Sequence, residues 1–130
     1  QRPYFPNLSQ NDIKALAEKA AKVIPEKTKY YAPLIGVNYA KITIRNQTSR
    51  WGSCSSNGNL SFNCLLMLCP DSCIDYVVVH ELCHRKALNH SPRFWRLVEN
   101  ILPDYKARRA WLRENGSAIV NSMIHVRNLK

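Results

Sequence analysis

Apolar residues recur at helical spacing near the start of the chain, over residues 13–24. Ser9 and Asp12 precede this stretch with the spacing of a capping box, so a helix is predicted to begin there. Pro25 is expected to end this helix, or to restart it as a short helical stretch over residues 26–32, because proline lacks a backbone N–H. The first part of the chain is therefore predicted to be helical.

The pattern changes to short stretches typical of strands after Gly36. Strands are predicted over residues 39–45, 51–54 and 60–63, and Asn57-Gly58 predicts a two-residue hairpin turn between the last two. The predicted fold class is therefore α+β, in which a small antiparallel β-sheet packs with helices.

A further helix is predicted after Pro70, where Ser72 has the position of an N-cap and Asp75 that of its partner. Apolar residues then follow helical spacing and are expected to face the core: Ile74, Val77, Val78 and Leu82. His80 and His84 lie four residues apart and share a different face of the same helix.

The stretch from His80 to His84 reads His-Glu-Leu-Cys-His, which is the spacing that lets two imidazoles bind one zinc ion. Glu81 lies beside this face and can reach a water on the metal without becoming a ligand. Histidines on an ordinary solvent-exposed helix are the alternative. The helix start and the apolar positions around the motif favour the metal site.

The third ligand decides whether such a site is catalytic, because a catalytic zinc ion usually has three protein ligands and one open position. We expect His90 to be this ligand, since Asn89 can adopt a left-handed turn and Ser91-Pro92 can start a new helix. The spacing equals that of the metzincins, but Ala87 stands where that signature requires glycine, which excludes the assignment. Glu99, on the next helix, is the alternative ligand.

The other histidine and the cysteines are expected to have no catalytic role. His125 lies near the end of the chain and is expected at the surface. The five cysteines are odd in number and lack paired CxxC spacing, which indicates free thiols in a reducing cytoplasm. Cys64, Cys69 and Cys73 as a second metal site are the alternative to buried thiols.

Length, hydrophobic content and charge indicate the number of domains, the location and the kind of partner. A chain of 130 residues with 45% hydrophobic content is expected to form a single domain over residues 1–130. There is no long apolar run and no basic-then-apolar leader, so no membrane interaction is expected and the cytoplasm is the expected location. The 19 basic and 9 acidic residues give a net charge of +10, which indicates attraction to DNA or another polyanion.

Several motifs occur in one order along the chain: Arg50-Trp51-Gly52-Ser53-Cys54, Asn63, residues 76–84, Asn89-His90-Ser91-Pro92, Phe94-Trp95, residues 103–106 and Trp111-Leu112. Together they resemble the YgjP-like metallopeptidase family, distant relatives of the SprT and Spartan zincins. The resemblance covers residues 30–116 and leaves residues 117–130 unassigned. It implies a zincin-like fold, zinc bound by His80, His84 and His90, and Glu81 as the general base. It also implies that an N-terminal region of most family members is absent or reduced here.

The expected function is that of a zinc metallopeptidase, in which Glu81 assists the attack of a zinc-bound water on a peptide bond of a protein or peptide substrate. The resemblance implies that an edge strand, either 51–54 or the strand ending at Asn63, pairs with the substrate. Asn63 either binds the substrate backbone or stabilises the turn after its strand. Phe94 and Trp95 are expected to support the His90 loop. Arg50, Tyr76 and Tyr105 are candidate oxyanion stabilisers by chemistry, although surface pairing or core packing is favoured for each.

Two other functions remain open. A metal-dependent nucleoside triphosphate pyrophosphatase or phosphohydrolase would use the many basic residues, but the chain has no Gly-rich phosphate loop. A nucleic-acid-binding module with a structural zinc ion would have no need of Glu81 beside its metal. Resemblance to Spartan-type enzymes, which cut proteins attached to DNA, adds a peptidase recruited by DNA.

Overall fold

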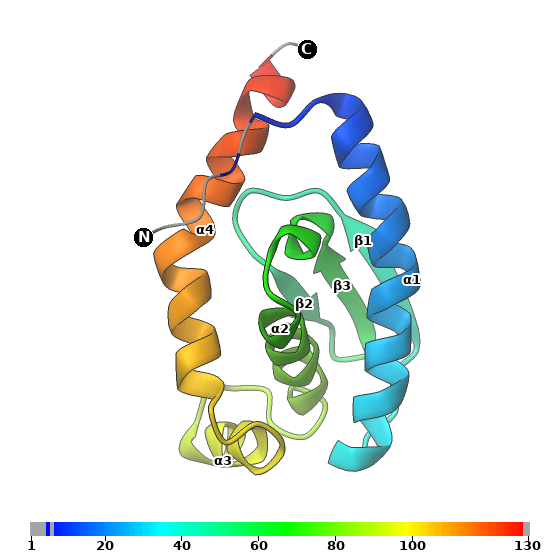
Figure 1. Cartoon of the computed structure of the whole chain (residues 1–130). Coiled ribbons are helices and arrows are strands. Elements are labelled where there is room, and N and C mark those ends of the chain that lie inside the picture. Colours follow the sequence, from blue (N-terminus) through cyan, green and yellow to red (C-terminus); the bar gives the residue numbers. More distant parts are fainter. Residues whose placement is uncertain (1–4, 6, 129–130) are drawn as a thin grey trace.

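The helices and a small sheet of the computed structural model surround one central helix. The structure describes residues 5 and 7–128. Helix α1 (Gln10–Ile35) and helix α4 (Tyr105–Asn128) stand on either side of helix α2 (Asp71–Cys83), and the sheet lies behind α2 (Figure 1). The remaining elements are strands β1 (Lys41–Arg45), β2 (Gly52–Cys54) and β3 (Asn59–Asn63), the 3₁₀ helix η1 (Cys64–Leu68) and helix α3 (Pro92–Ile101). The α+β class is as predicted.

Helix α1 begins as predicted and continues past the predicted end. The side chain of Ser9 accepts a hydrogen bond from the backbone of Asp12, and the carboxylate of Asp12 accepts one from the backbone of Ser9. Pro25 lies inside the helix, so the prediction that it ends or restarts the helix was wrong. Buried residues continue on one side of α1 both before and after Pro25, from Ala20 to Ile35. Their burial outweighs the single backbone hydrogen bond that proline removes.

The sheet is mixed, whereas the sequence predicted an antiparallel one. Its order is β1-β3-β2, with β3 parallel to β1 and antiparallel to β2. Strand β3 takes the central position because its Leu60 and Phe62 are fully buried, at 0% and 1% exposure. Strand β2 pairs with one side of β3 and strand β1 with the other side. Strand β2 is therefore an edge strand of the sheet.

The hairpin lies where it was predicted but uses a longer turn. The N–H of Gly58 donates to the carbonyl of Ser55 at 3.0 Å, so Ser56 and Asn57 are the central residues of the turn. Gly58 has a φ of 86°, and Asn57 does not have the positive φ that a two-residue type I′ turn requires. The glycine thus follows the turn instead of forming its second corner.

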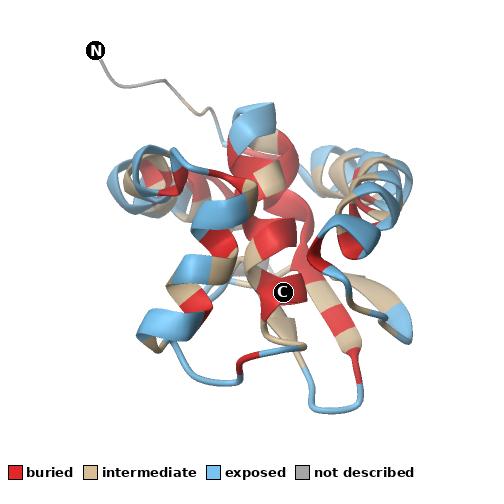
Figure 2. Ribbon diagram, turned by 90° about the horizontal axis from the view of Figure 1, so that it is seen from below, coloured by how far each residue is buried: buried red, intermediate tan, exposed pale blue. Residues whose placement is uncertain are grey.

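Helix α2 is the centre of the core. Its N-cap is Pro70, without a side-chain hydrogen bond, so the assignment of Ser72 as N-cap was wrong. The carboxylate of Asp75 accepts a hydrogen bond from Lys27 at 2.7 Å instead of capping α2. Buried residues occupy most positions of α2, and Figure 2 shows the buried residues gathered in the middle of the molecule. Because α2 is buried on most sides, the backbone of its last turn is held in place by packing.

The last part of the chain completes the core. Residues 117–128, to which the sequence assigned no role, continue helix α4. Ile119 and Met123 are fully buried, and the N–H of Leu8 donates to the carbonyl of Ser122 at 2.7 Å. The side chain of His125 lies outside the described residues. None of the helices in the described part of the chain has the length and apolar character needed to cross a membrane.

The five cysteines are free thiols, as predicted. Cys54 is half-buried and the other four are buried. Cys64, Cys69 and Cys73 do not form a metal-binding group within residues 5 and 7–128, so they are packing residues of the core.

Candidate metal centre

The end of helix α2 places two histidines on one side. His80 lies in its last turn and His84 is the C-cap, with φ −65° and ψ −14°. The helix tightens here, because the N–H of His84 donates to the carbonyl of Glu81 at 3.2 Å. His84 nevertheless keeps a right-handed helical conformation. Its ring centroid therefore lies 5.0 Å from that of His80.

His90 approaches these rings from the loop between α2 and α3. Its ring centroid lies 5.1 Å from that of His80 and 4.9 Å from that of His84. Asn89 does not have a positive φ, so the predicted left-handed turn is wrong. The new helix does start as predicted, since the Ser91 side chain accepts from the N–H of Phe94 at 3.3 Å.

The three imidazoles form a group that fits a metal ion. Their ligand nitrogens all lie within 4.8 Å of one another. Three imidazole nitrogens are a ligand set typical of zinc. Glu99 is exposed and does not belong to this group. In the described part of the chain no fourth His, Cys, Asp or Glu joins the group, which matches a catalytic site with an open position.

Contacts of the ring nitrogens favour the metal-binding form of the histidines. Nδ1 of His84 lies 3.1 Å from the carbonyl oxygen of Ala87, which can only accept a hydrogen bond. Nδ1 of His80 lies 3.2 Å from Oε2 of Glu81. Each contact assigns the proton to Nδ1 and leaves the lone pair of Nε2 for a metal. Burial, helped by the neighbouring imidazoles, lowers the pKa of His90 and favours its neutral form.

Aromatic side chains hold the three histidines in place. Phe94 is fully buried and its ring stacks on His84 at 4.4 Å. The same ring meets His80 at 5.0 Å and His90 at 5.1 Å, and Trp95 stacks on His90 at 5.8 Å. The start of α3 therefore supports the His90 loop, as predicted.

Glu81 lies beside the histidines under strand β2. The residue is only 6% exposed. A Cβ atom on Gly52 would lie 3.1 Å from Cγ and 3.2 Å from Oε2 of Glu81, and 3.1 Å from the carbonyl oxygen of Ser61. Glycine at this position leaves room for the carboxyl group. Gly52 lies within one of the sequence motifs, but its role could not be predicted from the sequence, because the approach of β2 to α2 is a tertiary contact.

Two hollows meet at the histidines. The larger, about 560 Å³, is lined by His80, Glu81 and His90 together with the residues of one wall: Arg50, Trp51, Tyr76, Val77, Arg109 and Arg113. The smaller, about 300 Å³, is lined by His84, Leu88 and strand β2. Residues of strand β2 line both hollows, and β2 is an edge strand, whereas β3 is paired on both sides.

Other candidate residues divide between the cleft and the core. Arg50 and Tyr76 line the larger hollow, whereas Tyr105 is buried and stacks on Trp95 at 5.2 Å. The amide of Asn63 donates to the carbonyls of Gln47 and Arg50 at 2.9 and 3.1 Å, and its oxygen accepts from the N–H of Leu65 at 3.0 Å. Asn63 therefore stabilises the chain around its strand, which is the structural one of the two predicted roles.

Comparisons with known proteins agree with this geometry. The structure is similar to the metallopeptidase zymogen abylysin of Pyrococcus abyssi, with a TM-score of 0.63, 21% identity, and coverage of 71% of this chain and 94% of that one. It is also similar to the metallopeptidase zymogen jannalysin of Methanocaldococcus jannaschii, with a TM-score of 0.63, 19% identity, and coverage of 72% and 97%. A comparison with curated proteins finds no match. The sequence pattern of the YgjP-like metallopeptidase domain matches residues 6–115, a longer stretch than the predicted 30–116 because it takes in α1. The chain therefore belongs to the YgjP-like metallopeptidase family.

Proposed function

We propose that this protein is a zinc-dependent peptidase whose metal ligands are His80, His84 and His90. The observation that carries the proposal is the group of three imidazoles with the carboxyl group of Glu81 beside it and a cleft in front of it. Neutral imidazole nitrogens suit zinc better than magnesium or calcium, which prefer oxygen ligands. A bound zinc ion supplies Lewis-acid polarisation of the scissile carbonyl and acidifies a water molecule.

Glu81 is the proposed general base and, later, the general acid. Its Oε2 lies 3.2 Å from a ring nitrogen of His80, but the residue does not belong to the group of ligand atoms. The carboxylate takes a proton from the attacking water and returns it to the leaving amine. No protein nucleophile is needed. Cys83, inside the motif, is fully buried, and burial raises its pKa to about 12.

Strand β2 is the proposed site of substrate pairing. It is an edge strand whose residues line both hollows at the histidines, and an extended peptide can add to an edge strand through backbone hydrogen bonds. A peptide held in this way passes in front of Glu81, whose carboxyl group packs against Gly52 of the same strand. The substrate class that follows is an unfolded or extended polypeptide segment.

The test compares wild type with Glu81→Gln after the bound metal of both proteins has been measured. We expect Glu81→Gln to keep its zinc and to lose about 10²- to 10⁴-fold in the rate of hydrolysis of an unfolded protein, because the base is removed and the ligands remain. Glu99→Gln is the matched control, since Glu99 is exposed and outside the site. It should retain both metal and activity.

The same proteins should be tested on proteins linked to DNA and on nucleoside triphosphates. Faster cleavage of the DNA-linked protein than of the free protein would indicate recruitment by DNA. Equal cleavage by wild type and Glu81→Gln would show that the role of Glu81 is wrong. Hydrolysis of a nucleoside triphosphate without any cleavage of polypeptide would replace the proposed function with that of a phosphohydrolase.

A further inference from the structure

One wall of the larger hollow carries arginines from helix α4. Arg109 and Arg113 lie four residues apart, on one side of that helix, and both line the hollow together with His80, Glu81 and His90. Arg50, from the loop before β2, also lines this hollow. The positive charge is thus placed beside the proposed metal site.

Arg109 is exposed, and its guanidinium group contacts an aromatic side chain. It lies over the ring of Trp95, with Cζ 5.1 Å from the ring centroid. That ring stacks on Tyr105 at 5.2 Å and on His90 at 5.8 Å. These ring contacts place the cation of Arg109 near His90.

These arginines have no anionic partner among the described residues. The neighbouring Arg108 is paired, with Nε 2.9 Å from the carboxylate of Asp104, but no ion pair joins Arg109, Arg113 or Arg50 to an acidic side chain in residues 5 and 7–128. Glu81 is the one acidic residue among those that line the larger hollow. The wall is complementary to a negative group of the substrate.

The direction of β2 indicates which part of a peptide meets this wall. The strand runs from Gly52, at the larger hollow, to Cys54, which lines the smaller hollow with His84 and Leu88. Antiparallel pairing is the more stable arrangement for an added strand. A peptide paired in this way has its N-terminal part at Leu88 and its C-terminal part at Arg109 and Arg113.

We infer that Arg109 and Arg113 select substrates with a carboxylate on the C-terminal side of the scissile bond, within one or two residues of it. This inference rests on the proposed function and names a substrate class for it. The carboxylate has two possible sources, an Asp or Glu side chain or the C-terminal α-carboxylate of a short leaving peptide. A planar guanidinium group binds either one through two parallel hydrogen bonds.

A peptide carboxylate fits this place better than a nucleic acid does. The arginines face a hollow of about 560 Å³, which has room for a few amino-acid residues. A duplex needs a long row of cations along an open surface, since each phosphate contact adds a small share of the binding energy. The charge at the site is instead concentrated beside the reacting bond.

The first experiment locates the scissile bond and then varies its neighbours. Zinc-loaded wild type digests an unfolded protein mixture, and mass spectrometry maps the cleaved bonds. Asp and Glu should be enriched at the first or second position after the bond. Peptide pairs that differ only by Glu or Gln at that position, each with a free or an amidated C-terminus, should then differ about 10-fold in kcat/KM in favour of the carboxylate.

The variants Arg109→Gln and Arg113→Gln should bring the Glu/Gln ratio close to one. Zinc content and thermal unfolding like those of wild type show that the variants are folded and loaded. Arg96→Gln is the matched control, because Arg96 is exposed and lines neither hollow. Arg113→Glu should turn the preference toward a peptide with Lys at the same position.

The outcomes separate this inference from the proposed function. Cleavage of Glu and Gln peptides at equal rates by wild type, with no difference between free and amidated C-termini, would overturn the inference and leave the peptidase intact. Absence of any peptide hydrolysis would overturn the proposed function. Loss of duplex DNA affinity in Arg113→Gln with an unchanged Glu/Gln ratio would assign the wall to nucleic acid and also overturn the inference. A preference confined to peptides with a free C-terminus would support it and identify the α-carboxylate as the ligand.

Discussion

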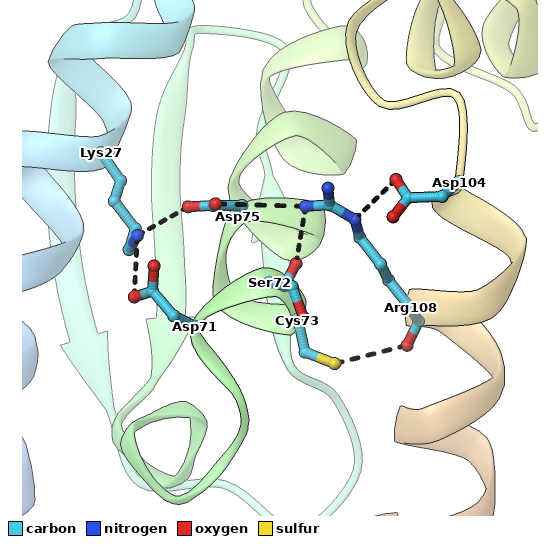
Figure 3. Close-up of polar contacts among 7 residues, drawn as sticks. All are labelled: Lys27, Asp71, Ser72, Cys73, Asp75, Asp104 and Arg108. Atoms are coloured by element: carbon cyan, nitrogen blue, oxygen red, sulfur yellow. Dashed lines mark hydrogen bonds and ion pairs between the residues drawn. The ribbon is translucent and has the colours of Figure 1, made fainter.

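The two ends of helix α2 carry the two main polar clusters of the molecule, and they differ in how their charges are balanced. At the N-terminal end, Lys27 of α1 lies 2.9 Å from the carboxylate of Asp71 and 2.7 Å from that of Asp75, and Arg108 of α4 pairs with Asp104 at 2.9 Å and with Asp75 at 4.0 Å (Figure 3). Figure 3 also shows Arg108 donating to the carbonyl of Ser72, at 3.0 Å. This cluster is complete within the protein and joins three helices.

At the C-terminal end, His80, His84 and His90 converge without an anion among their ligand atoms, and Glu81 lies beside them. Their ligand nitrogens lie within 4.8 Å of one another, His80 and His90 line a cleft, and no further His, Cys, Asp or Glu of the described residues belongs to the group. A cluster of ionisable groups therefore indicates function when its charges are not balanced within the protein and the cluster opens into a cleft. A cluster whose charges compensate one another is structural.

The largest effect is expected from removing a ligand at the open end. His90→Ala should abolish zinc binding at moderate zinc concentrations and with it the peptidase activity. It should also abolish the stabilisation of wild type by zinc, which is about 4 kcal/mol when free zinc exceeds Kd 1,000-fold. Thermal unfolding with and without zinc, together with metal analysis, measures this.

Glu99→Ala is the control for the ligand assignment, because Glu99 is exposed on α3. It should retain zinc and the zinc-dependent increase in Tm. Retention of zinc by His90→Ala, combined with its loss in Glu99→Ala, would show that the third ligand is Glu99.

A smaller effect is expected from displacing the base while the ligands remain. Gly52→Ala should lower kcat by about 10- to 100-fold, since the new Cβ would lie 3.1 Å from Cγ of Glu81 and force the carboxyl group to move. Zinc content should not change. Steady-state kinetics on a fluorogenic peptide and metal analysis test both statements.

Gly116→Ala is a matched control, because its Cβ would meet the Trp51 ring at 3.4 Å, an ordinary contact. Alanine also favours helix α4, so this variant should be at least as stable as wild type and equally active. If Gly52→Ala retained full kcat, the close approach of β2 would have no part in positioning Glu81.

The smallest effect is expected at the closed end. Lys27→Met should lower the free energy of unfolding by about 1–2 kcal/mol, because it leaves Asp75 with only the weaker contact to Arg108. Zinc content and kcat should not change, since the metal site lies at the other end of α2. Urea unfolding measures the loss, with Lys29→Met, an exposed position on the same helix, as control.

The pH dependence of this loss has a definite sign. Burial lowers the pKa of Lys27, but the hydrogen bonds and ion pairs with Asp75 and Asp71 outweigh burial, and the net change raises it. The folded protein therefore holds this proton more tightly than the unfolded chain, whose lysine pKa is about 10.4. The difference in stability between wild type and Lys27→Met should be constant around neutral pH and shrink as pH rises through the folded pKa of Lys27. A difference that stayed the same after Lys27 had lost its proton would contradict the ion pair.

The two clusters also differ in how far the sequence reveals them. His80 and His84 are four residues apart, so helical geometry alone places them together, and the nearby helix start at Ser91 makes the return of His90 predictable. Lys27, Asp75 and Arg108 lie on three different helices and carry no local signal. In the sequence, Arg109 and Arg113 are likewise only two residues of a basic stretch. The tertiary structure shows that both line the cleft.

The sequence by itself determined the features whose cause is local: the capping box at Ser9, the cap at Ser91, the position of the hairpin, the four-residue spacing of His80 and His84, and the class of the fold. Only the tertiary structure decided that α1 continues through Pro25, that β1 joins β3 in parallel, and that residues 117–128 complete the core. The physical reason is that residue spacing determines contacts only within one or two turns of a helix or one hairpin. The area that a residue buries depends on contacts with the whole chain. Where the two compete, as at Pro25, the larger buried area prevails.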